Sequence, residues 1–241
     1  MPKLLNFRKP LSIENKSIKK AEISIYGVIG GGFWEEGITA KSFNEELKKL
    51  DPNTEEITLR INSPGGDVFD GITIMNRLKQ HPAKITVYVD GLAASIASII
   101  AMAGDKIVMG EGALMMIHKP MTMAYGNSAD FEEMIKRLDD VEEQLLSIYQ
   151  RKTKLDRSEL RNMLAKATWM DAEEAKSLGF ADELMASDEE LNIAACCDKA
   201  YWLKDMPKIK SKNDYIKNKI NNLRSNVGNL LASSAVIPKT K

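Results

Sequence analysis

Short β-type runs alternate with helix-type runs over most of this 241-residue chain, and this alternation limits the possible folds more than any other feature. The runs AEISIYGVI, EEITLRIN and KITVYVDG each precede a segment whose apolar residues recur at helical spacing. Strands that are separated by helices pair in parallel rather than as hairpins. The sequence therefore predicts an α/β domain with a largely parallel sheet over residues 21–187.

The segments on either side of this domain differ from it in composition. Residues 1–20 are polar and basic, and we expect them to form an N-terminal arm. Residues 188–241 contain a lysine-rich run, and we expect a weakly helical or disordered tail. The only cysteines, Cys196 and Cys197, are adjacent and poorly placed to form a stabilising disulfide, which favours a reducing compartment.

Charge, hydropathy and motifs give no support for nucleic-acid binding, membrane insertion, secretion or nucleotide hydrolysis. The formal net charge is zero, which gives no general argument for nucleic acid or an anionic membrane as partner. No apolar run reaches the roughly 18 residues of a membrane span, and the N-terminus MPKLLNFRKP lacks the apolar centre of a signal peptide. A phosphate-binding Gly-x-x-x-x-Gly-Lys loop is also missing. We expect a cytoplasmic protein without a metal, a cofactor or an ATPase motor of its own.

Residues 128–154 have apolar side chains at helical spacing with charged residues between them. A helix of this length is about twice as long as the average of about 11–12 residues. Two interpretations stay open. The helix projects and meets another subunit through its apolar stripe, or it lies over the core of its own chain.

The stretch GLAASIASIIAMAG offers a candidate nucleophile where a strand ending at Gly91 meets a helix that begins at Ser95. Backbone N–H groups and the positive end of the helix dipole lie near such a hydroxyl. The N–H of Ile96 would be a natural donor to an oxyanion formed at Ser95. The alternative is simple packing of small residues at a helix start.

Two further motifs carry matching chemistry. In INSPGGD, Gly65 and Gly66 allow a tight turn that exposes backbone N–H groups. His118 ends the predicted strand ALMMIH, where an imidazole could take a serine proton and return it to a leaving amine. The other histidine, His81, lies in the polar loop KQHPAK, and we expect it to be solvated. Either motif alone is also compatible with a purely structural role.

Together, INSPGGDVFDG, GLAAS and MMIHKP resemble, in this order, the three signatures of the ClpP-type serine peptidases, whose fold is related to that of crotonases. The resemblance covers about residues 21–184. Within the family, the sequence looks most like the ClpP-related head maturation proteases of phages and prophages. It implies a spiral of β-β-α units in which Ser95 is the nucleophile, His118 the base, and the Gly66 and Ile96 amides the oxyanion hole. It also implies that strand edges near these motifs clamp an extended peptide. The substrate-binding residues would be Asp67, Val68, Phe69, Met121, Thr122 and Met123.

The sequence departs from the family pattern at the third member of the catalytic triad. The family has an acid where ATWMDAEEA has Ala167. Asp171 is a weak substitute because it is better explained as a helix N-cap. A backbone carbonyl or the Thr168 hydroxyl could orient the imidazole instead, or the site could be inactive. We favour a working Ser95–His118 pair without a carboxylate.

Two other candidates are less suitable. Ser98 lies one turn into the helix, away from its free N–H groups. Lys119 follows His118 on an extended strand, so the two side chains point to opposite faces.

Three functions remain in competition. The first is a serine endopeptidase acting on polypeptide, for which the resemblance implies stacked homo-oligomeric rings and, as partners, a separate AAA+ unfoldase or capsid and scaffold proteins. The second is a catalytically silent assembly subunit with the same scaffold. The third is a crotonase-type acyl-CoA enzyme, in which Asp67 and Asp70 would supply acids near the oxyanion hole.

Overall fold

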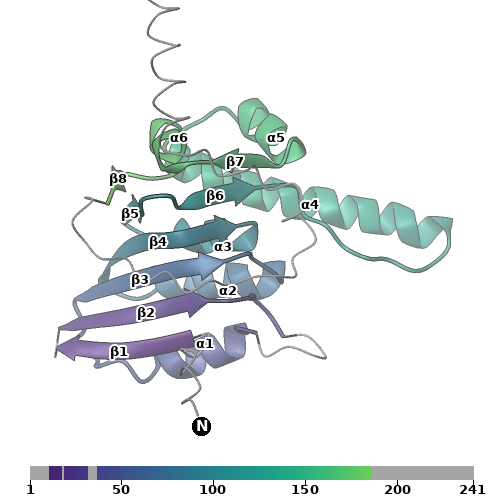
Figure 1. Ribbon diagram of the computed structural model, residues 1–241. Helices are drawn as coiled ribbons and strands as arrows, with labels where there is room; N and C mark the ends of the chain where they lie inside the picture. The colour runs from purple at the N-terminus through teal and green to yellow at the C-terminus, as the bar shows by residue number, and fades with distance from the viewer. Residues whose placement is uncertain (1–10, 18, 32–36, 186–241) are drawn as a thin grey trace, which may run out of the picture. The chain divides into compact units, whose positions relative to one another are not determined.

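The computed structural model describes residues 11–17, 19–31 and 37–185, and Figure 1 shows their arrangement. The strands are β1 (Leu11–Ser17), β2 (Lys20–Tyr26), β3 (Glu56–Ser63), β4 (Lys84–Ala94), β5 (Lys106–Met109), β6 (Leu114–Ile117), β7 (Thr168–Met170) and β8 (Glu183–Leu184). The helices are α1 (Ala40–Leu47), α2 (Val68–Lys79), α3 (Ile96–Ala101), α4 (Ser128–Thr153), α5 (Arg157–Ala165) and α6 (Ala172–Ser177).

The strands form one sheet, ordered β1-β2-β3-β4-β5-β8, with β6 paired to both β4 and β7. The pairs β2–β3, β3–β4, β4–β5, β4–β6 and β5–β8 are parallel. Only β1–β2 and β6–β7 are antiparallel among the described strands. Helices α1, α2 and α3 connect β2 to β3, β3 to β4 and β4 to β5, so the predicted α/β fold with a largely parallel sheet is confirmed.

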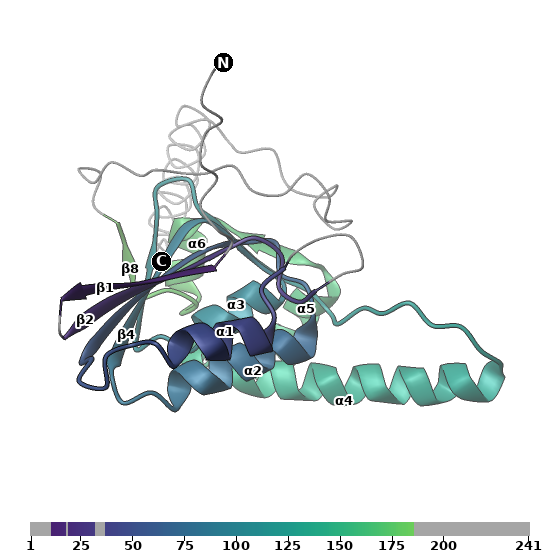
Figure 2. The same ribbon diagram turned by 90° about the horizontal axis from the view of Figure 1, so that it is seen from below.

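One face of the sheet is covered by α1, α2 and α3, as Figure 2 shows. The strand residues on this face are fully buried and alternate with half-buried ones, which is the period of a strand with one core face. Examples from β3 and β4 are Ile57, Leu59, Ile61, Val87 and Val89, each at most 1 % exposed.

Helix α4 has different surroundings along its length. Its buried residues, from Glu142 to Tyr149, all lie in the second half. In the first half Phe131 and Ile135 are 45 % and 60 % exposed, and Figure 2 shows this part extending past the sheet. The second half of α4 therefore lies over the core of its own chain, and the first half projects. The predicted contact of the projecting half with another subunit stays a prediction.

Two elements of the fold, β1 and α5, were not predicted from the sequence. The expected N-terminal arm contains β1, an edge strand whose Leu11 and Ile13 pack against the core. Two apolar residues in a polar segment were too weak a pattern to predict it. Helix α5 was also missed. Residues 1–10 and the whole predicted tail lie outside the described residues, and no helix in the described part is long and apolar enough to cross a bilayer.

Candidate active site

Ser95 lies in a sharp turn between strand and helix. Strand β4 continues through Ala94, past its predicted end at Gly91, and α3 begins at Ile96. Between them Ser95 has φ 55° and ψ −129°. A positive φ at a residue with a side chain costs about 1–3 kcal/mol, and such strain concentrates at functional sites. The turn has the character of the strained strand-to-helix elbow that exposes the nucleophile in α/β-hydrolases.

His118 reaches this turn from the neighbouring strand. Strand β6 pairs in parallel with the last residues of β4, with Ala94 opposite Met116. The Ser95 N–H also donates to the Met116 carbonyl at 2.8 Å. His118 follows two residues after Met116, and its Nε2 lies 2.7 Å from Ser95 Oγ. Burial lowers the pKa of His118, so the imidazole is neutral at pH 7 and able to accept a proton.

The Gly65–Gly66 turn packs directly against Ser95. Gly65 has φ 92°, and a Cβ on it would lie 2.7 Å from both Ala94 O and Ser95 Cβ. Hydrogen bonds from Ile29 N–H to Gly65 O (2.8 Å) and from Asp67 N–H to Ile29 O (2.9 Å) hold the turn on either side of Gly66. The contribution of Ile29 was not visible in the sequence.

The predicted oxyanion donors lie in the same pocket as Ser95 and His118. The pocket, of about 50 Å³, is lined by all four of these residues. Ile96 is the first residue of α3, and an N–H at that position has no acceptor within its helix. The rest of the lining is mainly apolar and consists of Val68, Ile99, Pro120, Met121, Leu145 and Tyr149.

Neither segment predicted to clamp the peptide is a regular strand in this structure, and the clamp itself stays a prediction. Asp67 is the N-cap of α2 and accepts a hydrogen bond from Asp70 N–H at 2.8 Å, so Val68 and Phe69 belong to the first helical turn. Residues 121–123 follow Pro120 and form no regular strand. The helix start after the glycine turn and the proline after β6 account for the difference.

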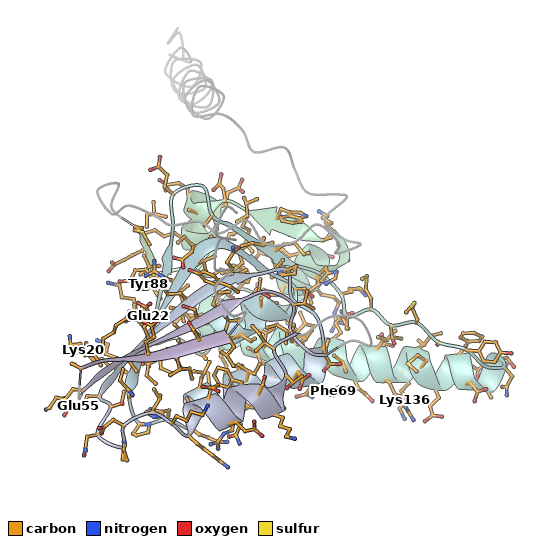
Figure 3. The ribbon with its side chains drawn as sticks, turned by 60° about the horizontal axis from the view of Figure 1, so that its bottom comes forward. Lys20, Glu22, Glu55, Phe69, Tyr88 and Lys136 are labelled. Atoms are coloured by element: carbon orange, nitrogen blue, oxygen red, sulfur yellow. The ribbon has the colours of Figure 1, made fainter. Side chains whose placement is uncertain are left out.

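Of the six predicted substrate-binding residues, only Val68 and Met121 line the pocket. Phe69 and Met123 are 68 % and 99 % exposed, and Figure 3 shows Phe69 at the surface. Thr122 is exposed as well.

The position expected for the third triad member lies next to the end of the β6–β7 pairing. Strand β7 runs antiparallel to β6 with Thr168 opposite Ile117 as their last pair, so Ala167 and His118 are the residues next to that pair. Ala167 has a positive φ of 50°, and its methyl group cannot accept a hydrogen bond. Thr168 shares the face of Ile117, opposite to that of His118, and its hydroxyl donates to Met163 O at 2.8 Å. The Thr168 hydroxyl is therefore a poor orienter of the imidazole.

Asp171 is too far along the strand to replace the missing acid. It follows Met170, whose partner Met115 lies three residues, or about 10 Å, from His118. Its carboxylate instead accepts from Glu174 N–H at 2.8 Å in a capping box at the start of α6. With the Thr168 hydroxyl and Asp171 engaged elsewhere, a backbone carbonyl is the remaining candidate for orienting the imidazole.

The remaining candidates have structural partners. Ser98 is fully buried and its Oγ donates to Ser95 O at 2.6 Å. Lys119 forms an ion pair with Glu142, with 3.0 Å between Nζ and Oε2. Asp70 accepts from Ala40 N–H at 2.8 Å. His81 is half-buried rather than solvated, and its Nδ1 accepts from Ala83 N–H at 3.1 Å.

Comparison with known proteins gives a consistent result. The profile of the family described as Clp protease matches residues 18–188. ATP-dependent Clp protease proteolytic subunit 1 of Chlamydia abortus is 28 % identical over 169 residues, which are 66 % of this chain and 88 % of the relative. The proteolytic subunit of Deinococcus radiodurans is 30 % identical over 155 residues (63 % and 76 %), and that of Leuconostoc citreum 34 % over 148 residues (60 % and 74 %). The resemblance to ClpP-type peptidases is confirmed, while the closer likeness to phage head maturation proteases stays a prediction. The chain therefore belongs to the Clp protease family.

Proposed function

We propose that this chain is a serine endopeptidase that uses Ser95 as nucleophile and His118 as general base. The observation that carries the proposal is the 2.7 Å contact between His118 Nε2 and Ser95 Oγ, in a pocket that Gly66 and Ile96 also line. A neutral imidazole in hydrogen-bonding contact with a serine hydroxyl is the arrangement that nucleophilic catalysis requires.

Each step of the reaction has a group to perform it. His118 Nε2 takes the proton of Ser95 Oγ as this oxygen attacks the peptide carbonyl carbon. The tetrahedral oxyanion accepts hydrogen bonds from the Gly66 and Ile96 N–H groups. On collapse the C–N bond breaks, and His118 gives its proton to the leaving amine. Water, deprotonated by His118, then attacks the acyl ester; the C–O bond to Ser95 breaks, and His118 returns the proton to Ser95 Oγ.

The pocket favours an apolar side chain on the substrate residue whose carbonyl is attacked. Its walls beyond the catalytic groups are aliphatic, thioether or aromatic, with Val68, Met121 and Leu145 among them. An ionised side chain would lose its hydration there without gaining a partner. Peptides with Leu or Met at this position are therefore the preferred substrate class.

The second candidate is a silent assembly subunit, and Ala167 is the observation that favours it. In a serine protease, an Asn in place of the orienting aspartate lowers kcat by roughly 10⁴-fold because the histidine adopts the wrong tautomer. Against this, the short contact between Ser95 and His118 is already formed. The acyl-CoA enzyme is not supported, because Asp67 and Asp70 both accept helix-capping or backbone hydrogen bonds.

The proposed working form is a homo-oligomer of stacked rings in the cytoplasm. Phe131 and Ile135 on the first half of α4 supply exposed apolar surface suited to contact between copies. Folded substrates would require a separate ATP-driven unfoldase. If the protein acts in phage head maturation, its substrates would be capsid or scaffold polypeptides.

A fluorogenic peptide assay tests the function. Wild-type enzyme should cleave a peptide with Leu before the scissile bond and should discriminate against the same peptide with Asp there. Ser95→Ala and His118→Ala should each abolish cleavage, whereas Ser177→Ala in α6 should not. An assembled wild-type protein that cleaves none of these peptides would favour the silent subunit.

A further inference from the structure

A buried pair of hydroxyl groups lies directly behind the candidate oxyanion hole. Ser98 is fully buried on α3, and its Oγ lies 2.8 Å from the hydroxyl of Tyr149 on α4, which is 1 % exposed. The Ser95 carbonyl oxygen accepts two hydrogen bonds, from Ser98 N–H at 3.0 Å and from Ser98 Oγ at 2.6 Å. The two hydroxyls are therefore connected by hydrogen bonds to the backbone carbonyl of the proposed nucleophile.

The direction of these hydrogen bonds follows from the number of protons. A serine hydroxyl has one proton, and that of Ser98 is donated to the Ser95 carbonyl. The bond to Tyr149 must then be donated by the tyrosine. Burial raises the pKa of Tyr149, so its hydroxyl keeps this proton over the whole working pH range. The chain of donation runs from Tyr149 to Ser98 to Ser95 O.

The acceptor carbonyl belongs to the peptide unit that carries the candidate oxyanion donor. Ser95 C=O and Ile96 N–H are two ends of one planar group, so fixing the carbonyl fixes the direction of the N–H. The torsion that turns this plane is Ser95 ψ, which is −129° beside a strained φ of 55°. Two donors on the carbonyl also polarise the peptide and strengthen its N–H as a donor.

We infer that Ser98 and Tyr149 are positioning residues of the oxyanion hole, which hold the Ser95–Ile96 peptide so that the Ile96 N–H meets the developing oxyanion. This inference rests on the proposed function and deepens it. Neither residue touches the reacting atoms. Tyr149 also packs edge-on against Phe180, with ring centroids 5.6 Å apart, so its hydroxyl is held in place by the core.

The test compares Ser98→Ala, Tyr149→Phe and the double variant in peptide cleavage. Removing an oxyanion donor outright costs roughly 10²–10³ in kcat, and turning one away should cost part of that. We expect Ser98→Ala to lower kcat about tenfold with KM within about twofold of the wild type, and Tyr149→Phe to lower it less. The double variant should be no slower than Ser98→Ala, because both changes interrupt one chain of hydrogen bonds.

The matched control is Ser177→Ala. Ser177 Oγ donates to Glu174 O at 2.9 Å, the same bond to the third residue before it, in another six-residue helix. It should keep the wild-type kcat.

The double variant also separates positioning from folding. Ser98→Ala leaves the buried Tyr149 hydroxyl without its partner, and adding Tyr149→Phe removes that hydroxyl. We expect the melting temperature to recover in the double variant while kcat stays low. Recovery of both, or a kcat for Ser98→Ala equal to that of wild type, would overturn the inference. A wild-type enzyme without peptidase activity would instead refute the proposed function itself.

Discussion

Replacing Ala167 by aspartate should add the missing third member of the triad. Ala167 and His118 each adjoin the last β6–β7 pair, Ile117 and Thr168, and opposite Cβ atoms in such a ladder lie about 4.5–5.5 Å apart. An aspartate and an imidazole span that separation with one hydrogen bond. The backbone also suits the change, because φ is 50° and aspartate tolerates this region better than alanine does. Ala167 is exposed, so the carboxylate need not lose its hydration.

The size of the effect follows from the charge. A carboxylate within about 4–6 Å raises the pKa of a histidine by about 1–3 units, against the lowering that burial now causes in His118. The acid limb of the kcat/KM profile should shift upward by the same amount. Above that limb kcat should rise at least about tenfold, since a correctly oriented imidazole is worth up to roughly 10⁴ in related chemistry.

Two measurements read this out. Proton NMR follows the pKa of His118 directly, because the chain has only one other histidine. Peptide cleavage over pH gives the rate. Ala167→Asn has the same shape without the charge and should shift the pKa less, and Ala165→Asp, on the exposed end of α5, should leave both readouts at wild type. An unchanged pKa together with an unchanged rate in Ala167→Asp would refute the assignment of this position.

Three further predictions concern the turn, the histidine and the long helix. Gly66→Ala should abolish activity and lower the free energy of unfolding by more than about 1–3 kcal/mol, because φ is 145° and the new Cβ would lie 2.0 Å from Ile29 O. The control is Gly112→Ala, because Gly112 also has a positive φ but an added Cβ there meets no atom within 4 Å. In denaturant unfolding it should lose only the free energy of backbone strain. Equal losses of unfolding free energy in the two variants would contradict a steric clash at Gly66. Because burial lowers the pKa of His118, kcat/KM should rise with pH through a midpoint below 6.5. The stability that comes from keeping this histidine neutral should be lost as pH falls below about 6.5, which denaturant unfolding over pH would measure. A kinetic midpoint above 6.5 would contradict this prediction. The double variant Phe131→Glu, Ile135→Glu should lower the native mass measured by light scattering without loss of helix. Lys136→Glu, on the same part of α4 (Figure 3), should leave the mass unchanged. An unchanged mass in the double variant would show that α4 takes no part in the contact between copies.

Much of the fold could be predicted from local pattern. Short stretches of sequence are enough to predict that β3 and β4 alternate with helices, and to recognise the capping box at Asp171 and the paired glycines that pack beside Ser95. These features depend on the period of strands and helices and on backbone preferences, which short windows of sequence contain. Strand β1 has too few apolar residues to be recognised without its partner β2.

The finer geometry of the site depends on contacts between distant residues. Nothing near Ser95 in the sequence indicates its positive φ, which is set by β6 and by the Gly65 turn. The bond between Ser98 and Tyr149 joins residues 51 positions apart. The backbone at Asp67 differs from the predicted strand edge for a local reason, because an aspartate after two glycines caps a helix there.

Labelling by a fluorophosphonate probe would show directly whether Ser95 is an activated nucleophile. The probe reacts preferentially with a serine hydroxyl that an adjacent base activates, and peptide mass spectrometry identifies the modified residue. We expect modification of Ser95 in the wild-type protein, none in Ser95→Ala, almost none in His118→Ala, and wild-type labelling in Ser177→Ala. No labelling of Ser95 in a folded, assembled wild-type protein would contradict this expectation.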